Sequence, residues 1–249
     1  MNEISIGLLI PAPNVTMEKE LPRFAPDGVH LHWNRVPKSS LTVTPESVAE
    51  MGEHVVEAAR PLAMAGVRLL TYACTSGSFI LGQGWDEELN KRMTEATGLP
   101  AVTTSTAMLK ALKALGARKI GLATPYIDEI TSREVAFLEA NGFEVGAAKG
   151  LRIVESGKIP RVSQAEVRGL AYDVVRANAD GDALFISCTN LPTMDFLDEL
   201  EGELKIPVLS SNQVTLWWSL RLAGWDQPLE RGGRLLKEGK YWMVDEINR

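Results

Sequence analysis

The sequence predicts an α/β fold built from two pseudosymmetric halves, each with a parallel sheet. Three observations support this. Strand-like and helix-like patterns alternate along the chain. Residues 4–10 form the near-continuous apolar run of a parallel strand buried on both faces. Three segments of the first half recur in order in the second. With 249 residues, 45% of them hydrophobic, the chain can bury a large core.

The expected elements of the first half follow in order. Strands are predicted at residues 4–10, 29–36, 67–73 and 101–103, and helices at residues 45–65, 86–97 and 105–115. Gly66, Gly98 and Gly116 each stand where a glycine would end one of these helices. This βαβα order predicts a parallel sheet.

The repeat extends the same prediction to the second half. IGLLIP at 6–11 resembles IGLATP at 120–125, CTS at 74–76 resembles CTN at 188–190, and LPAVTTS at 99–105 resembles IPVLSSN at 206–212. We therefore expect one α/β half at residues 1–115 and a second at 116–225. The C-terminal tail, residues 226–249, is expected to join the first half.

Cys74 and Cys188 are the only cysteines, and each follows an apolar, strand-like run and precedes a threonine. Ligands of open parallel sheets bind beyond the carboxyl ends of the strands. If the two halves face each other, both thiols open onto one cleft. The alternative is that each cysteine is a buried apolar residue at a strand end; the duplicated context favours the cleft.

Composition excludes several classes of function. The net charge of −6 argues against a nucleic-acid surface and gives no sign of membrane binding. No apolar run of about 18 residues and no signal peptide are evident, which predicts a cytoplasmic protein with free thiols. The three histidines lack metal-ligand spacing, so no metal is expected. Trp217 and Trp218 fill either a core or a subunit contact, which leaves a homo-oligomer open.

At these cysteines the chain resembles the aspartate/glutamate racemase superfamily, whose members have two pseudosymmetric α/β halves with one catalytic cysteine in each. PAPNVTME at 11–18 looks like the PSSNTTME segment of the maleate cis–trans isomerase branch. ATPY at 123–126 is similar to a segment shared by that branch and the arylmalonate decarboxylases. The resemblance spans nearly the whole chain.

At several motif positions the sequence differs from the other branches of the superfamily, and these differences favour the isomerase branch. Amino-acid racemases usually carry an acid after the first strand and a histidine after the second Cys-Thr, where this chain has Asn14 and Asn190. Arylmalonate decarboxylases keep only the second cysteine and usually follow it with glycine, whereas this chain has Cys74 and, after Cys188, Thr189. The resemblance therefore implies a cofactor-independent isomerase of maleate or a related cis-enedioate. A racemase or decarboxylase acting alpha to a carboxylate, or a non-catalytic dicarboxylate-binding protein, remain as alternatives.

The isomerase resemblance points to Cys74 as the nucleophile and Cys188 as its acid/base partner. Each cysteine precedes a turn into a predicted helix, whose N–H groups would lower the thiol pKa. The candidate donors to substrate carboxylates are Asn14, Thr75, Ser76, Tyr126, Thr189 and Asn190. Two polar stretches, residues 37–44 and 156–162, are candidate lids that keep water from a carbanion. The expected partner is a small dicarboxylate.

Overall fold

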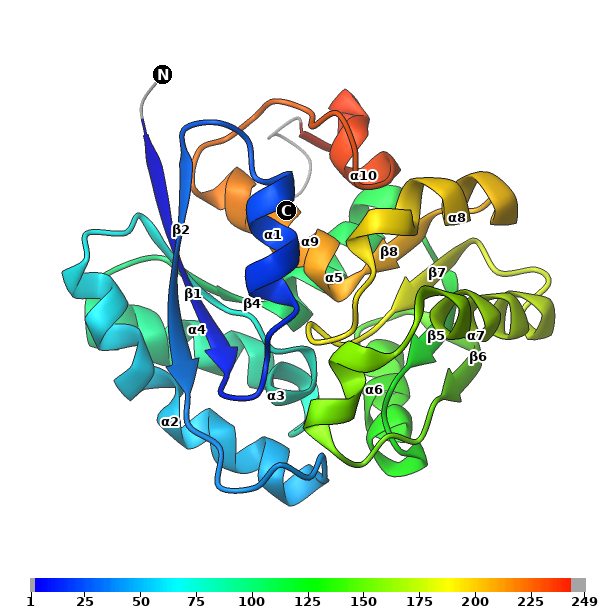
Figure 1. The fold of residues 1–249 in the computed structure, drawn as a ribbon, viewed down its shortest axis with the longest axis horizontal. Coiled ribbons are helices and arrows are strands. Elements are labelled where there is room, and N and C mark those ends of the chain that lie inside the picture. Colours follow the sequence, from blue (N-terminus) through cyan, green and yellow to red (C-terminus); the bar gives the residue numbers. More distant parts are fainter. Residues whose placement is uncertain (1–2, 243–249) are drawn as a thin grey trace.

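A computed structural model describes residues 3–242 and confirms the predicted fold class. Two four-stranded parallel sheets have the orders β2-β1-β3-β4 and β6-β5-β7-β8. The two orders are the same topology repeated, as the sequence repeat predicts. Figure 1 shows the sheets side by side with their flanking helices.

The first sheet and its helices come from the first part of the chain. Their order is β1 (Ile4–Pro11), α1 (Met17–Phe24), β2 (Val29–Val36), α2 (Pro45–Met64), β3 (Leu69–Tyr72), α3 (Thr75–Phe79), α4 (Trp85–Thr97), β4 (Ala101–Thr103) and α5 (Thr104–Leu115). β1 lies between β2 and β3 and is almost wholly buried, which explains its continuous apolar sequence.

The second sheet repeats this arrangement. Its elements are β5 (Lys119–Thr124), α6 (Asp128–Ala140), β6 (Glu144–Gly150), the 3₁₀ turn η1 (Ser156–Arg161), α7 (Gln164–Ala177), β7 (Ala183–Ile186), the 3₁₀ turn η2 (Met194–Phe196), α8 (Leu197–Leu204), β8 (Val208–Ser210) and α9 (Ser211–Leu222). α10 (Arg234–Lys237) and the 3₁₀ turn η3 (Gly239–Trp242) follow.

The prediction that a helix follows each cysteine is correct for Cys74 and wrong for Cys188. A helix, α3, does begin directly after Cys74. After Cys188 the chain instead makes a turn, in which the Leu191 N–H donates to the Cys188 carbonyl at 3.1 Å. Pro192 disfavours the helical conformation for the residue before it, so the turn after Cys188 does not continue into a helix through Leu191. Cys188 therefore has no helix N-terminus behind it.

The two halves meet across α5 and α9, which pack against each other. Buried hydroxyl groups pair across this contact: Thr104 with Thr215 at 2.8 Å, and Thr71 of β3 with Ser219 at 2.9 Å. Such pairs satisfy polar groups that burial would otherwise leave without partners. Trp217 of α9 is wholly buried within the chain, and Trp218 is nearly so. Both tryptophans therefore belong to the core.

The described part of the tail contacts both halves. The Gly232 N–H donates to Asp198 of α8 at 2.8 Å, and a Cβ at Gly232 would lie 3.3 Å from the Phe24 ring of α1. The whole tail, residues 226–249, was expected to join the first half. Residues 243–249 lie outside the described residues, so this expectation stays a prediction. The domain boundaries at 115 and 225 stay predictions.

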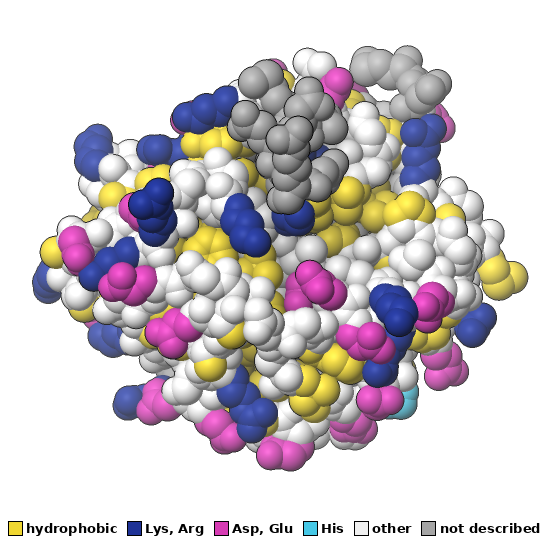
Figure 2. Space-filling view, turned by 180° about the vertical axis from the view of Figure 1, so that it is seen from behind, with side chains coloured by type: hydrophobic (Ala, Val, Ile, Leu, Met, Phe, Trp, Pro, Cys, Tyr) yellow, Lys and Arg dark blue, Asp and Glu magenta, His cyan; other side chains and the backbone are white. Residues whose placement is uncertain are grey.

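Charged side chains of both signs are interspersed over the face shown in Figure 2. No helix in the described part of the chain is long and apolar enough to cross a membrane. Within residues 3–242, no group of three or more His, Cys, Asp or Glu side chains is arranged to hold a metal ion.

Candidate active site

The two cysteines occupy equivalent places in the two sheets. The Ala73 N–H, just before Cys74, donates to Leu9 of β1 at 2.8 Å. The Ser187 N–H, just before Cys188, donates to Ala123 of β5 at the same distance. In each sheet this is the boundary between the two central strands, where the strand order reverses and ligands of such sheets bind.

Both thiols open onto one pocket between the halves. Its empty space, including the mouth that opens to solvent, is about 420 Å³. All eight predicted site residues line it: Asn14, Cys74, Thr75, Ser76, Tyr126, Cys188, Thr189 and Asn190. The remaining wall consists of Pro11, Pro13, Lys38, Val43, Val48, Met51, Ser156 and Ile159.

Cys74 is surrounded by hydrogen-bond donors. Its sulfur accepts from the Gly77 N–H of α3 at 3.3 Å, and the Ser76 hydroxyl lies 3.9 Å away. Burial raises the pKa of the Cys74 thiol. The Gly77 N–H, the hydroxyls of Tyr72 and Ser76, and the Lys38 ammonium all act in the opposite direction.

Cys188 has less support for a negative charge. Burial raises its pKa to about 12, and negative charge on Cys74, or on Glu134 once the pH passes the Glu134 pKa of about 8, acts in the same direction. The Asn190 N–H and the Tyr126 hydroxyl oppose this effect. Cys188 therefore keeps its proton at neutral pH. Its backbone φ of 90° is uncommon for a residue with a side chain, the kind of strain that gathers at functional sites.

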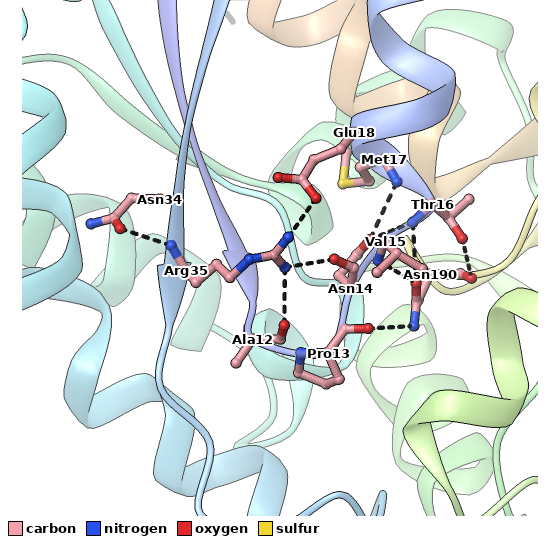
Figure 3. A network of polar contacts seen from close by, with 10 residues as sticks. All are labelled: Ala12, Pro13, Asn14, Val15, Thr16, Met17, Glu18, Asn34, Arg35 and Asn190. Atoms are coloured by element: carbon pink, nitrogen blue, oxygen red, sulfur yellow. Dashed lines mark hydrogen bonds and ion pairs between the residues drawn. The ribbon is translucent and has the colours of Figure 1, made fainter.

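Asn14 and Asn190 tie the loop after β1 to the second half (Figure 3). The Asn14 amide donates to the Thr189 hydroxyl at 3.1 Å, and its oxygen accepts from two N–H groups at the start of α1. The Asn190 oxygen accepts from the N–H groups of Val15 and Thr16. On the other side, the Arg35 guanidinium of β2 donates to the Asn14 carbonyl at 2.7 Å.

The hydroxyls predicted to donate to substrate carboxylates differ in whether they already donate to other groups of the protein. The Thr75 hydroxyl donates to Ser211 at 2.8 Å, and the Thr189 hydroxyl donates to the Ala73 carbonyl at 3.1 Å. Both hydroxyls therefore already hold the halves together. Ser76 and Tyr126 present their hydroxyls to the thiols instead. Burial raises the pKa of Tyr126 well above its usual value, so its hydroxyl remains a donor.

Lys38 is a pocket residue that the sequence analysis placed only in a candidate lid. Within the described residues it is the one cation in the pocket wall. Its ammonium donates to the Thr42 carbonyl at 2.6 Å and to the Ser156 hydroxyl at 3.2 Å. Burial lowers its pKa, while negative charge on Cys74 and Cys188 raises it. A lone lysine in a polar stretch gave no signal strong enough to single it out.

The two candidate lids are joined to each other beside the pocket. The Val43 N–H donates to the Val154 carbonyl at 2.6 Å, and the Ser156 N–H donates to the Leu41 carbonyl at 2.8 Å. Thr42 and Glu155 thus form an isolated antiparallel bridge. One strand of the bridge comes from each half, so the bridge, which reaches Glu155 just before the second stretch, spans their boundary beside the pocket.

The sequence analysis also missed Glu134, a wholly buried residue of α6. One of its oxygens accepts from the Ser187 hydroxyl at 2.7 Å, and the other has no partner within the described residues. Burial raises its pKa to about 8. Glutamate at a mid-helix position usually faces water, so nothing in the local pattern marked it.

The chain as a whole is similar to known proteins. The profile of the arylmalonate decarboxylase family matches residues 6–236, nearly the whole chain. The chain belongs to the arylmalonate decarboxylase family. The arylmalonate decarboxylase of Bordetella bronchiseptica is 36% identical over 231 residues, 92% of each chain. The maleate isomerase of Nocardia farcinica is 29% identical over 241 residues, 94% of this chain and 95% of the relative.

One solved structure of a similar protein holds a reaction intermediate. It is a mutant of the Nocardia farcinica maleate cis–trans isomerase with one cysteine changed to serine, holding a covalently bound succinylcysteine intermediate. It superposes with a TM-score of 0.86 at 25% identity, covering 95% of this chain and 99% of that one. The predicted membership of the racemase-like superfamily, with maleate isomerase relatives, is confirmed.

Proposed function

We propose that this enzyme is a cofactor-independent cis–trans isomerase of maleate or a related short cis-enedioate. The observation that carries the proposal is the pair of thiols in one pocket with unequal surroundings. Burial raises the pKa of both thiols, but at Cys74 it is opposed by three donors and the Lys38 ammonium, whereas at Cys188 it is opposed mainly by two donors, and the pKa of that thiol reaches about 12. Such a pair supplies a nucleophile and an acid at one site.

In the proposed reaction the Cys74 thiolate adds to one alkene carbon, and the π electrons move to the second carbon and its carboxylate. The Cys188 thiol gives its proton to that second carbon. The bond between the two carbons is then single and rotates. The Cys188 thiolate takes the proton back, the double bond re-forms in the trans geometry, and the Cys74 thiolate leaves, so no atom is gained or lost.

The pocket wall supports a dianionic substrate. Lys38 can pair with one carboxylate, and the hydroxyls of Ser76 and Tyr126 are donors on the thiol side. Charge-assisted hydrogen bonds of this kind are stronger than neutral ones. The bridge between the candidate lids limits access of bulk water, which protects an enediolate from side reactions.

The test is to incubate the enzyme with maleate and follow fumarate by proton NMR. We expect fumarate to form without added metal or cofactor. Absence of turnover would defeat the maleate assignment, and turnover that survives Cys74→Ala would defeat the nucleophile assignment. A catalytically inactive binding protein would bind maleate but leave its NMR spectrum unchanged.

A second candidate is decarboxylation of an arylmalonate. It is favoured by the match to the decarboxylase family and by the apolar residues Val43, Val48, Met51 and Ile159 on one side of the pocket. Loss of CO₂ would leave a carbanion that takes the proton of Cys188. In that case phenylmalonate would release CO₂, and the activity would survive Cys74→Ser but not Cys188→Ser.

The same thiols could instead exchange the proton alpha to a carboxylate, as a racemase does, with one thiol on each face of the carbon. This reading is tested by incubating 2-phenylpropionate or amino acids in D₂O. Deuterium at the alpha carbon that requires both cysteines would replace the isomerase proposal.

A further inference from the structure

Tyr72 ends β3, two residues before Cys74, and its ring lies entirely inside the protein. Within residues 3–242 its hydroxyl has no hydrogen-bond partner in good geometry, although it lies close enough to Cys74 to act on the pKa of that thiol. Buried hydroxyls almost always have a hydrogen-bond partner, and leaving such a hydrogen bond unmade costs free energy of folding. The group therefore calls for a partner that forms in another state of the protein.

Gly77 shows how close this hydroxyl lies to the Cys74 sulfur. A Cβ built on Gly77 would be 2.2 Å from the Tyr72 hydroxyl oxygen and 3.0 Å from the Cys74 sulfur. The hydroxyl and the sulfur therefore flank the same small space. Any larger residue at position 77 would occupy that space, so the glycine allows the phenol to approach the thiol.

Charge decides which way a hydrogen bond between them would run. Burial raises the pKa of Tyr72 well above its usual value, and negative charge on Cys74 raises it further. The phenol thus keeps its proton over the working pH range and can donate it. A neutral thiol is a weak acceptor, whereas a thiolate is a strong one. A strong acceptor for the Tyr72 hydroxyl is then present when Cys74 is ionised.

Other groups also face the Cys74 sulfur, and they define what Tyr72 can add. The Gly77 N–H and the Ser76 hydroxyl come from α3, and the Lys38 ammonium comes from the stretch after β2. Tyr126 and Cys188 approach from the second half. Of these, only Lys38 carries a positive charge, and it stands on the pocket side.

We propose that Tyr72 is a positioning residue whose phenolic hydroxyl donates a hydrogen bond to the Cys74 thiolate as that thiolate forms. It stabilises the nucleophile from behind, since it does not line the pocket. This inference deepens the proposed function, because it concerns the nucleophile of that reaction.

The test measures ionisation of Cys74 without any substrate. In a Cys188→Ser background, the rate of alkylation by iodoacetamide is followed against pH, and its inflection gives the pKa of the Cys74 thiol. Tyr72→Phe should move the inflection upward by about one pH unit or more, and slow alkylation at pH 7 about tenfold, since a hydrogen bond to a charged group is lost. An unchanged inflection would overturn the proposal.

Controls separate this effect from a loss of structure. Tyr172→Phe removes an exposed phenol that bonds to Glu203 far from the pocket, and it should leave the inflection unchanged. Tyr72→Leu also lacks the hydroxyl, so it should shift the inflection in the same direction if Tyr72→Phe fails to fold. Because alkylation needs no substrate, the result stands whether or not maleate is turned over.

Discussion

Cys74 and Cys188 share a sequence context but differ in their surroundings. Cys74 begins a short helix and accepts an N–H from Gly77. Cys188 begins a turn, carries backbone strain at φ 90°, and lies near the buried Glu134. An environment of donors favours the thiolate, while burial beside negative charge favours the thiol. The structure thus distinguishes two groups that the repeat makes look alike.

This difference predicts which cysteine becomes covalently modified. In Cys188→Ser the carbanion formed on Cys74 should take its proton from water, and no thiolate is left to remove that proton again. A succinyl adduct on Cys74 should therefore accumulate. Intact-mass spectrometry and peptide mapping would locate the adduct. Cys74→Ser should give none, and an adduct on Cys188 in that variant would reverse the assignment of roles.

Glu134 predicts a pH-dependent stability. Its folded-state pKa is about 8, above the ordinary 4.5, so it favours folding fully below pH 4.5 and progressively less as the pH rises to 8. Glu134→Gln cannot ionise and escapes this loss. The variant should gain thermal stability relative to the parent protein as the pH is raised from 5 to about 9.

Thermal melting of both proteins across this pH range is the measurement. Glu139→Gln, on the same helix but exposed, is the matched control and should show no such trend. A difference between parent and Glu134→Gln that stays constant with pH would contradict the argument.

At the scale of elements, the sequence predicted most strands and helices of the first half because their patterns are local. The strand at 29–36 and the helix at 45–65 match β2 and α2 closely. α1 was not predicted: it has eight residues, contains Pro22, and lacks a side-chain cap from Thr16, so its local signals are weak. Contacts with α9 of the other half hold it in place.

The stretch after β2 predicts a role for Lys38 in binding. Lys38→Met keeps much of the side-chain volume but removes the charge that faces the pocket. The KM for maleate should rise about tenfold or more, as expected for loss of a charge-assisted hydrogen bond. Steady-state kinetics check this.

Lys149→Met is the matched control, since Lys149 pairs with Asp173 on the surface at 2.6 Å. Its KM should equal that of the parent enzyme. If Lys38→Met also left KM unchanged, the substrate carboxylate would have to be bound by neutral donors alone.

At the scale of the whole molecule, Glu20 of α1 joins the two halves. Its buried carboxylate accepts from the N–H groups of Thr193 and Met194 and from the Asn212 amide, at 2.8, 3.2 and 2.6 Å. Burial raises the pKa of Glu20, and these three donors lower it. Three donors from the second half thus depend on one residue of the first.

Glu20→Ala should therefore lower the free energy of unfolding by about 2–4 kcal/mol, because it leaves buried donors without an acceptor. Urea denaturation measures this. Lys19→Ala, an exposed change on the same helix, should stay within about 0.5 kcal/mol of the parent. Equal stability of the two variants would show that water replaces the carboxylate.

The sequence alone determined the α/β class, the duplication, the pairing of Cys74 with Cys188 and the polar residues next to them in the repeated motifs. Each rests on a local pattern, since strand periodicity and repeated motifs are written along the chain. Only the tertiary structure decided what surrounds each thiol. Lys38, Tyr72 and Glu134 reach the cysteines by folding from separate elements, and burial and charge at a site depend on every element that packs there.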